Sequence, residues 1–579
     1  PLDCLSHSNY LTMKKLLYKI FVVSGLCAAL SSCSFLEVEP QVICSDTFYN
    51  TEKEVQYGLA GVYGVMSNEA LYGNYYSLMY SNVDDLSYFN RDQGSNLLQF
   101  NRHTAGTSQI YDMWVELYQG IRNANAFMEA VVKTEFDPEG KYYNEARFLR
   151  AYYHFLLAQA WGDVPVRKQA VTTHDEVMIA STPQFEALSW VAGEMEECVA
   201  LAPESLEDAP SRVSQTTVHG ILARVYLFMA GESVKGGDKT KLLTSAMNHA
   251  DAVITSAKHQ LNPDYSQIFK NMIMDKYDTE YHESMWEVDF YGDRSSAENW
   301  SNGRIGDVIG LQSTGSSGFD TWNCNYSYGQ YDGSLKLWDL YWRTDRTEDE
   351  NELATVTDKR QMWNLPPYNY AGNNNHPPYG SGLTSGKSIV SIDKTPYVYD
   401  NVSTNQDPLA APGIRNCGKY RREVEYEGHK SAKFLYTTIN YPILRYSDVL
   451  LMYAEASNEL GGVTQKAYDC VKAVRERAGI KTKDMSEYDK ASFREMIRKE
   501  RGRELCFESL RRYDLIRWGI FVEEMNKYTE WAADPRWSKN VKSNRAASMG
   551  SYIKPMHVVL PIPSIELGVN DLLVQNPLW

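Results

Sequence analysis

Aromatic rings surrounded by amides and charges gather in three short segments of this sequence. Trp300 lies in AENWSNGR, Trp322 lies in FDTWNCNYSYGQYDG, and a third segment, YFNRDQGSN, covers residues 88–96. A flat indole or phenol ring contacts the C–H face of a sugar at little entropic cost, and nearby amides or charges bind the hydroxyl groups. This composition predicts sugar binding. The candidate glycan-binding residues are Trp300, Trp322, Asn323, Tyr326, Tyr328, Asn90 and Arg91.

The same rings have a second interpretation, because aromatic side chains also fill small cores. Trp286 lies in the alternating segment MWEVDF and is predicted to be a core residue of a strand. Trp338 and Trp342 are four residues apart and flank Leu340, a spacing that is typical of helix packing. For Trp300 and Trp322, local composition leaves ligand contact and core packing both open.

Sequence motifs for catalysis and metal binding are absent. The chain contains no H-E-x-x-H, EF-hand loop or C-x-x-C, and GSGLTSGKS at 380–388 lacks the first glycine of a phosphate-binding loop. Ser391 and Lys394 form an S-x-x-K without its companion motifs. A glycosidase needs two carboxyl groups across a cleft, which sequence does not reveal, so a surface glycoside hydrolase stays an alternative. No cofactor is predicted, and bound calcium is left open.

Charge and cysteine usage exclude further classes of protein. The 579 residues carry a formal net charge of −16, which argues against a nucleic-acid partner, because phosphate binding needs a basic surface. The nine cysteines are scattered, so we expect isolated thiols rather than a zinc site or a dense disulfide framework.

The N-terminal region has the pattern of a lipoprotein signal. From Met13 a Lys-rich stretch precedes an apolar run at 20–30, which is too short to span a membrane, and Leu30-Ser31-Ser32-Cys33 resembles a bacterial lipobox. We therefore predict an upstream extension at 1–12, a signal peptide at 13–32, lipidation of Cys33 and a tether at 33–50. Several acyl chains on Cys33 would anchor the protein stably to a membrane surface.

Helical periodicity is concentrated on both sides of an irregular middle region. Apolar residues recur every three or four positions in seven segments, which are 110–133, 144–161, 215–229, 241–257, 444–460, 465–478 and 492–518. Each helix has one apolar stripe, which antiparallel pairs stacked side by side would bury, as in tetratricopeptide repeats. We predict helical-repeat scaffolds at 51–279 and 441–579. Between them, residues 280–440 are rich in Gly, Asn, Trp and Tyr, and we predict a folded, loop-rich aromatic region, called the cap.

An ordered set of short motifs resembles the SusD/RagB family of Bacteroidetes surface lipoproteins. The motifs are SFLEVEP (34–40), RFLRA (147–151), WGDVP (161–165), YPILRYSDVLL (441–451), ERGREL (500–505), RYDLIRW (512–518), LPIP (560–563) and QNP (575–577). The resemblance implies a mostly α fold, with a tetratricopeptide-like helical-pair scaffold and an irregular cap containing a few short strands.

The resemblance also implies a function. Members of this family sit on the outer face of the outer membrane as lids over a SusC-like TonB-dependent β-barrel transporter, to which they deliver oligosaccharides or polysaccharides without catalysis. A RagB-like branch captures peptides, and a purely structural lipoprotein is a further alternative. Glu37 and Glu39 fit the acidic export signal of such lipoproteins. Within the motifs, the residues expected to form helix-packing ion pairs are Arg147, Arg445, Asp448, Arg501 and Glu504.

Overall fold

The computed structural model describes residues 48–290, 303–312, 327–342, 358–366, 413–425 and 436–579, with short gaps at 93, 95, 172, 174–175, 201–209, 414, 423–424 and 536–540. The chain divides into two units, residues 1–55 and 56–579. Helix α3 begins at Glu52 and ends at Tyr63, and all further elements belong to the second unit.

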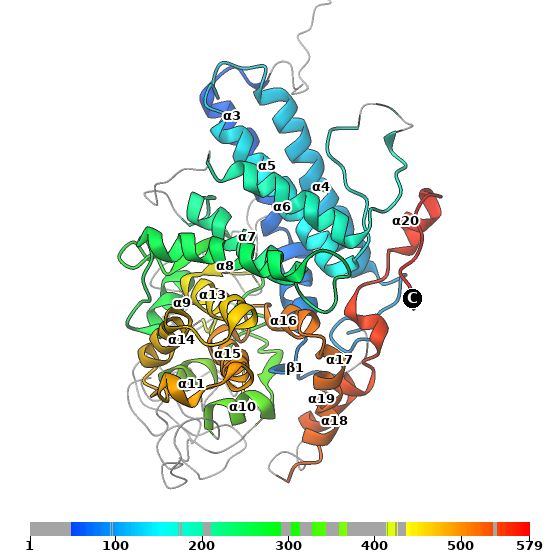
Figure 1. The fold of residues 1–579 in the computed structure, drawn as a ribbon. Helices are drawn as coiled ribbons and strands as arrows, with labels where there is room; N and C mark the ends of the chain where they lie inside the picture. The colour runs from blue at the N-terminus through cyan, green and yellow to red at the C-terminus, as the bar shows by residue number, and fades with distance from the viewer. Residues whose placement is uncertain are drawn as a thin grey trace, which may run out of the picture. The chain divides into compact units, whose positions relative to one another are not determined.

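The second unit is built on consecutive antiparallel helices (Figure 1). These are α4 (Ser108–Val131), α5 (Lys141–Trp161), α6 (Gln184–Cys198), α7 (Gln215–Met229), α8 (Lys239–Ser256), α13 (Tyr446–Gly461), α14 (Gln465–Arg477) and α15 (Lys490–Leu505). Each helix packs on the next, and α8 packs directly on α13 although the whole cap lies between them in the sequence. The array is therefore continuous, and the cap is an insertion into it.

The remaining elements are short. They are η1 (Gly64–Ser67), η2 (Glu69–Gly73), η3 (Tyr75–Ser81), α9 (Tyr265–Ile273), α10 (Leu335–Trp342), α11 (Lys359–Asn364), η7 (Met485–Glu487), α16 (Arg511–Arg517), α17 (Phe521–Asn526), α18 (Tyr528–Trp531), α19 (Val541–Ser551), η8 (Pro555–Val558) and α20 (Ser564–Val569). Among the helices of the described residues, none is both long and apolar enough to cross a lipid bilayer.

Six of the seven predicted helices are confirmed to within three residues at each end. Their ends follow local chemistry: the Ser214 hydroxyl accepts a hydrogen bond from the Thr217 N–H at the start of α7, and Gly162, with φ of 80°, ends α5. The prediction of one helix over 492–518 is wrong, because α15 ends at Leu505 and α16 begins at Arg511.

The break between α15 and α16 has a tertiary cause. Phe507 and Ser509 adopt left-handed backbone conformations, with φ of 64° and 60°. The buried Lys419 ammonium, which comes from the cap, donates hydrogen bonds to the carbonyls of Glu504 at 3.0 Å and Cys506 at 2.8 Å. A distant lysine thus binds the free carbonyls at the end of α15, and apolar periodicity cannot show this.

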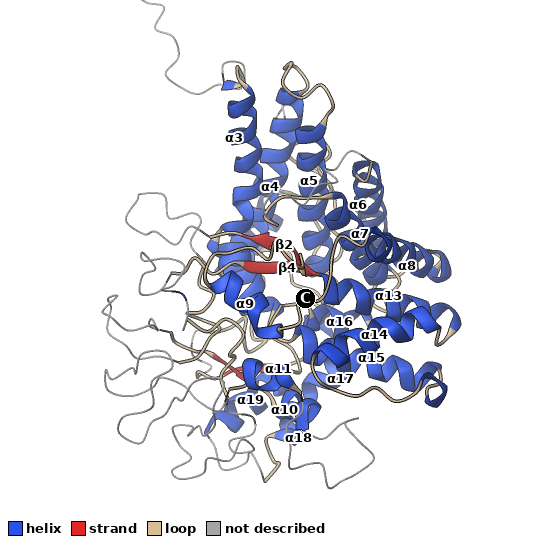
Figure 2. Cartoon of the chain, turned by 90° about the vertical axis from the view of Figure 1, so that its left-hand side faces the viewer, coloured by secondary structure: helices blue, strands red, loops and turns tan. Residues whose placement is uncertain are grey.

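Two short antiparallel strand pairs attach the cap to the helices. Strand β2 (Ser284–Val288) pairs with β4 (Tyr441–Arg445), and β1 (Ser87–Phe89) pairs with β3 (Tyr331–Gly333) (Figure 2). Trp286 in β2 is fully buried against Tyr152, with 4.7 Å between ring centroids, so its predicted role in a strand core is confirmed.

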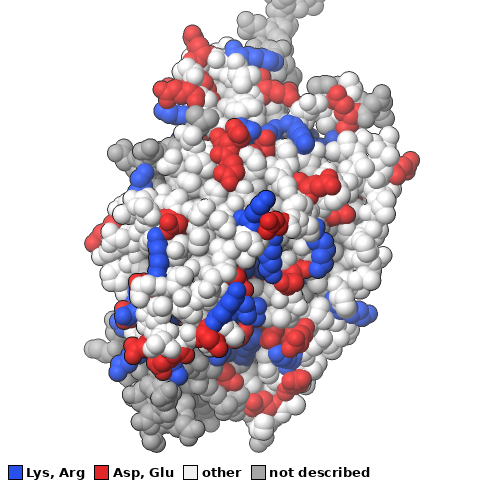
Figure 3. All heavy atoms as spheres, viewed as in Figure 1, with Lys and Arg blue, Asp and Glu red and all other residues white. Residues whose placement is uncertain are grey.

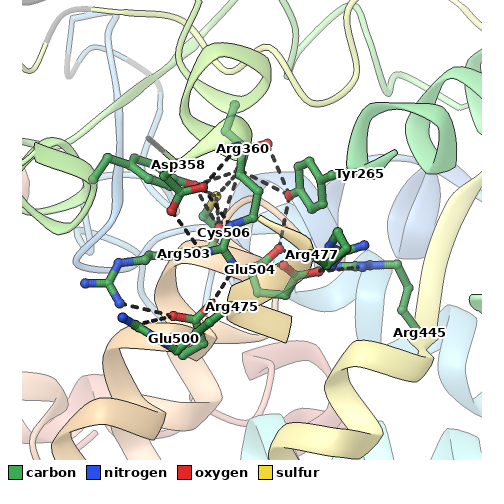
Figure 4. Close-up of polar contacts among 12 residues, drawn as sticks. Tyr265, Asp358, Arg360, Arg445, Arg475, Arg477, Glu500, Arg503, Glu504 and Cys506 are labelled. Carbon is green, nitrogen blue, oxygen red and sulfur yellow. Dashed lines mark hydrogen bonds and ion pairs between the residues drawn. The ribbon is translucent and has the colours of Figure 1, made fainter. Parts of the chain in front are cut away.

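Buried ion pairs join β4 to the last helices (Figure 4). Arg445, at the end of β4, binds Glu283 at 2.9 Å, Glu504 at 3.0 Å and Glu508 at 2.8 Å. Arg360, in α11, reaches the same Glu504 at 2.9 Å. Every one of these side chains is almost completely buried.

A second ion-pair network lies between α7, α13 and α15. Asp448 accepts hydrogen bonds from Arg224 at 2.8 Å and Arg501 at 2.7 Å, and Arg501 also binds Asp514 at 2.8 Å. Burial alone would raise the pKa of Asp448, but Arg501 and Arg224 outweigh it and lower that pKa to about 2. Arg147 binds Glu194 at 3.0 Å, so the predicted ion-pairing role of all five motif residues is confirmed.

Candidate functional site

Strand pairing brings together candidate segments that lie far apart in the sequence. The Asn90 N–H donates to the Gln330 carbonyl at 2.8 Å, across 240 residues of sequence. The Gly329 N–H donates to the Asp307 carbonyl at 3.2 Å, and the Gln330 N–H donates to the Val308 carbonyl at 2.8 Å. We call the region formed by residues 88–91, 303–312 and 327–333 the junction. It is one site, built from the segments that carry or directly follow the candidate residues.

Asn90 holds the junction together. Its side chain is 1% exposed, and its amide nitrogen donates to the Gly329 carbonyl at 2.8 Å and to Asp332 Oδ1 at 2.7 Å. Asn416 donates to the same Asp332 oxygen at 2.6 Å. The amide nitrogen of Asn90 is thus used within the fold, and we do not keep Asn90 among the proposed ligand contacts.

Gly329 occupies a position that only glycine fits. Its φ is 52°, and a Cβ there would lie 2.6 Å from the backbone nitrogen of Gln312. The chain on either side is therefore held in a fixed direction, and this direction places Tyr328 next to Arg91.

Arg91 and Tyr328 are the two candidate residues that remain accessible among those described. Both are half-buried, and the Arg91 guanidinium donates to the Tyr328 carbonyl. That contact fixes the arginine beside a partly exposed tyrosine. A flat ring next to a group that binds hydroxyls is the combination that sugar recognition uses.

Several candidates lie outside the described residues, namely Cys33, Trp300, Trp322, Asn323 and Tyr326. Trp338 is 4% exposed, and the Arg415 guanidinium stands 4.7 Å from its ring centroid, so the predicted packing role of Trp338 is confirmed. Trp342 ends α10, and only its backbone is described.

The structure adds two half-buried tyrosines that are not among the sequence candidates. The Tyr436 ring lies 5.9 Å from the Arg304 guanidinium, which Asp307 holds at 2.7 Å. Burial, with the carboxylates of Glu69 and Asp112, raises the pKa of Tyr75, which also interacts with Arg304 and Tyr436. Tyr75 lies in GNYYS, where two tyrosines follow an asparagine. The same combination of rings and amides was used to choose the sequence candidates, so Tyr75 could have been predicted from the sequence.

Metal and thiol chemistry find no support in the part of the chain that the structure describes. No group of three or more His, Cys, Asp or Glu residues there could hold a metal ion. Cys198, Cys417, Cys470 and Cys506 are free and buried, as predicted for isolated thiols. Burial raises the pKa of Cys198 to about 12, which leaves a thiol rather than a nucleophilic thiolate at neutral pH.

Comparison with known families identifies the fold. Residues 282–579 match the family described as "SusD family", and residues 34–227 match the family described as "Starch-binding associating with outer membrane". The chain belongs to the SusD family. SusD-like protein P25 of Formosa agariphila is 25% identical over 574 residues, which cover 94% of this chain and 95% of that protein.

Solved SusD-like structures share the architecture. A SusD homolog from Bacteroides thetaiotaomicron has a TM-score of 0.74 at 24% identity and covers 92% of this chain and 98% of its own. A laminarin binding SusD-like protein has a TM-score of 0.63 at 19% identity, covering 92% of this chain and 100% of its own. The predicted family and the predicted mostly α fold, with a helical-pair scaffold and a cap of few short strands, are confirmed.

Proposed function

We propose that this SusD-family chain binds glycans at the cell surface without catalysis and delivers them to a SusC-like TonB-dependent transporter. The observation that carries the proposal is the junction, where three segments distant in sequence meet and leave Arg91 and Tyr328 accessible. Oligosaccharides or polysaccharides are the proposed ligands, bound by rings on the sugar C–H faces and by amides and charges on the hydroxyl groups.

The names of the structural relatives support a glycan. One is a laminarin binding protein, and another is surface glycan-binding protein A from Bacteroides thetaiotaomicron in complex with laminarihexaose, with a TM-score of 0.62 at 18% identity and coverage of 90% of this chain and 99% of its own. The description "associating with outer membrane" supports the proposed location, where lipidated Cys33 would hold the protein on the outer face.

The charge pattern on one face of the molecule agrees with a neutral ligand. On the face drawn in Figure 3, Lys and Arg alternate with Asp and Glu, and neither sign forms a large continuous field. Many peptides would need clear charge complementarity, whereas a neutral glycan needs rings and hydrogen-bonding groups.

The proposal is tested by titrating the full-length chain in detergent micelles with laminarin and starch oligosaccharides. Trp300→Ala and Trp322→Ala are each expected to weaken binding by roughly two- to tenfold while the melting temperature stays within about 2 °C, since one lost ring contact is worth about 0.5–1.5 kcal/mol. Tyr57→Ala, which removes a 56% exposed ring elsewhere on the surface, is the matched control.

Three results would contradict the proposal. Unchanged glycan affinity in both tryptophan variants would remove the ring-based site, and binding of peptides in place of glycans would favour the RagB-like alternative. Shortened products after incubation with oligosaccharides would favour the glycoside hydrolase.

A further inference from the structure

Within the second unit, a pocket of about 380 Å³ lies between residues 56–67, the segment before α7 and the end of β2. Its walls include Leu59 and Tyr63 of α3, Ser211 and Arg212, and the two acidic residues Glu287 and Asp289. None of these residues belongs to the junction, so the pocket is separate from the proposed glycan site. Its volume suits a small ligand or the end of a larger one.

The two carboxyl groups of this pocket are held in place by neutral groups. Glu287 is 2% exposed and accepts a hydrogen bond from the Asn440 amide at 3.0 Å. Asp289 accepts one from the Tyr277 hydroxyl at 2.9 Å, and the Ser211 side chain of the same pocket is a second hydrogen-bonding neighbour that lowers the pKa of Asp289. Neither carboxyl group forms an ion pair with any Lys or Arg of the described residues.

The arginine in the same pocket does not compensate this charge. Arg212 binds Glu145, which also accepts a hydrogen bond from the Tyr63 hydroxyl at 2.8 Å. Asp275, a third carboxyl group, raises the pKa of both Glu287 and Asp289 through charge repulsion. Burial raises the pKa of Glu287 to about 8 and that of Asp289 to about 6, as expected for acids without a counter-ion.

This arrangement differs from that of the buried acids at the ion-pair networks, although Asp84 is likewise buried and is held by two backbone N–H groups. The buried carboxyl groups of Asp448, Glu504 and Glu508 are all paired with arginine. A buried carboxyl group next to open space and lacking such a partner is a site that an external cation stabilises. The other walls combine polar residues with the apolar Leu59, Met66 and Val288, against which the carbon skeleton of an organic ligand, but not a metal ion, would pack.

We propose that this pocket binds a small organic ligand through a protonated primary amine. The ammonium group carries three N–H donors. Asp289 supplies the opposite charge, both Asp289 and Glu287 supply acceptor oxygens, and the carbon skeleton lies against Leu59 and Met66. Such an amine occurs in amino sugars and in lysine side chains, and the chemistry of recognition is shared by both sources.

The test is calorimetric titration of the full chain in detergent at pH 7 with glucosamine and with Nα-acetyl-lysine amide. N-acetylglucosamine, which keeps the ring and loses the charge on nitrogen, is the control ligand. At least one amine is expected to bind, at least tenfold more tightly than N-acetylglucosamine, and the preferred amine identifies the source. If neither amine binds, or if the acetylated sugar binds equally well, the proposal is overturned.

Variants locate the binding in this pocket. Asp289→Asn keeps the side-chain size and removes the charge, so it is expected to weaken amine binding at least tenfold, whereas Glu523→Gln, an exposed acid elsewhere, leaves it unchanged. Ala60→Phe fills the pocket from the exposed face of α3 without altering either carboxyl group, and it is expected to abolish binding even if Asp289→Asn folds poorly. Unchanged affinity in Ala60→Phe overturns the proposal.

The pH dependence provides an independent readout. Because Asp289 must be ionised to bind an ammonium group, affinity for the lysine derivative, which stays protonated, is expected to rise about tenfold from pH 5 to pH 7. The other ionisable groups around it are Asp275, Tyr277, Glu287 and the Arg212–Glu145 pair. A flat profile over this range overturns the assignment to Asp289. A junction variant such as Arg91→Ala should leave the pH profile unchanged.

Discussion

Arg445 and Glu504 form an ion pair of 3.0 Å whose two side chains have no exposure to solvent. Arg445 ends strand β4, where the chain returns from the cap, and Glu504 lies in the last turn of α15. Glu504 also binds Arg360 and Arg477, so one carboxylate joins the cap, β4, α14 and α15 (Figure 4). The attachment of the cap to the scaffold therefore depends on this group.

We expect Glu504→Gln to lower the free energy of unfolding by about 3–5 kcal/mol, because it leaves buried arginines without their partner. Urea denaturation measures the change. The control is Glu232→Gln, which removes an exposed pair with Lys239 and should cost at most about 1 kcal/mol. Equal effects of the two substitutions would contradict the role given to Glu504.

Acid is expected to destabilise the protein through Asp448. Its pKa is about 2 in the folded state against 3.8 ordinarily, so its contribution of about 2 kcal/mol is complete above pH 4 and is lost as the pH falls through 2. Denaturation midpoints from pH 6 to pH 2 would show this loss. Asp448→Asn should be less stable than the wild type at pH 6 and lose less stability on acidification; an unchanged slope would contradict the assignment.

Gly329→Ala is expected to destabilise the junction by about 1–3 kcal/mol, since alanine disfavours a φ of 52° and its Cβ would contact the Gln312 backbone. Gly193→Ala is the matched control. Gly193 lies inside α6 with open space around it, and alanine there should stabilise by up to about 1 kcal/mol. Thermal unfolding of the two variants should shift in opposite directions, and shifts of the same sign would show that Gly329 is not required by its backbone conformation.

Arg91 and Asn90 are neighbours with different expected roles. Arg91→Ala should weaken glycan binding several-fold with little change in melting temperature, because Arg91 is half-buried at the proposed site. Asn90→Ala should lower stability by about 1–3 kcal/mol, because it leaves the buried Asp332 and Gly329 oxygens with fewer donors. Calorimetry and thermal melts on both variants separate the roles, and a reversed pattern would show that they were exchanged.

Cys33→Ala is expected to move the protein from the membrane fraction to the soluble fraction, since Cys33 is the predicted lipidation site. Fractionation of cells followed by immunoblotting measures the distribution. Cys44→Ala, a cysteine outside the lipobox, is the control and should stay with the membrane. Retention of the Cys33 variant in the membrane would contradict the anchor.

Local patterns in the sequence were sufficient for the scaffold helices. The apolar stripe of α7 and the adjacent Ser214 cap lie within the sixteen residues 214–229, so α7 was predicted at its observed bounds. Trp286 was predicted as a core residue because alternation along a strand is equally local. The break after Leu505 was missed because the group that stabilises it, Lys419, is 87 residues away from Cys506.

The sequence by itself determined the helices, the ordered motifs of the SusD family and the kind of side chain offered to a ligand. Only the tertiary structure decided that α8 packs on α13, that Asn90 holds the junction while Arg91 stays accessible, and that Glu287 and Asp289 lack the arginine partners that Asp448 and Glu504 have. The physical reason is range: helix formation depends on residues three or four positions apart, whereas burial and charge compensation depend on residues that the chain brings together from hundreds of positions away.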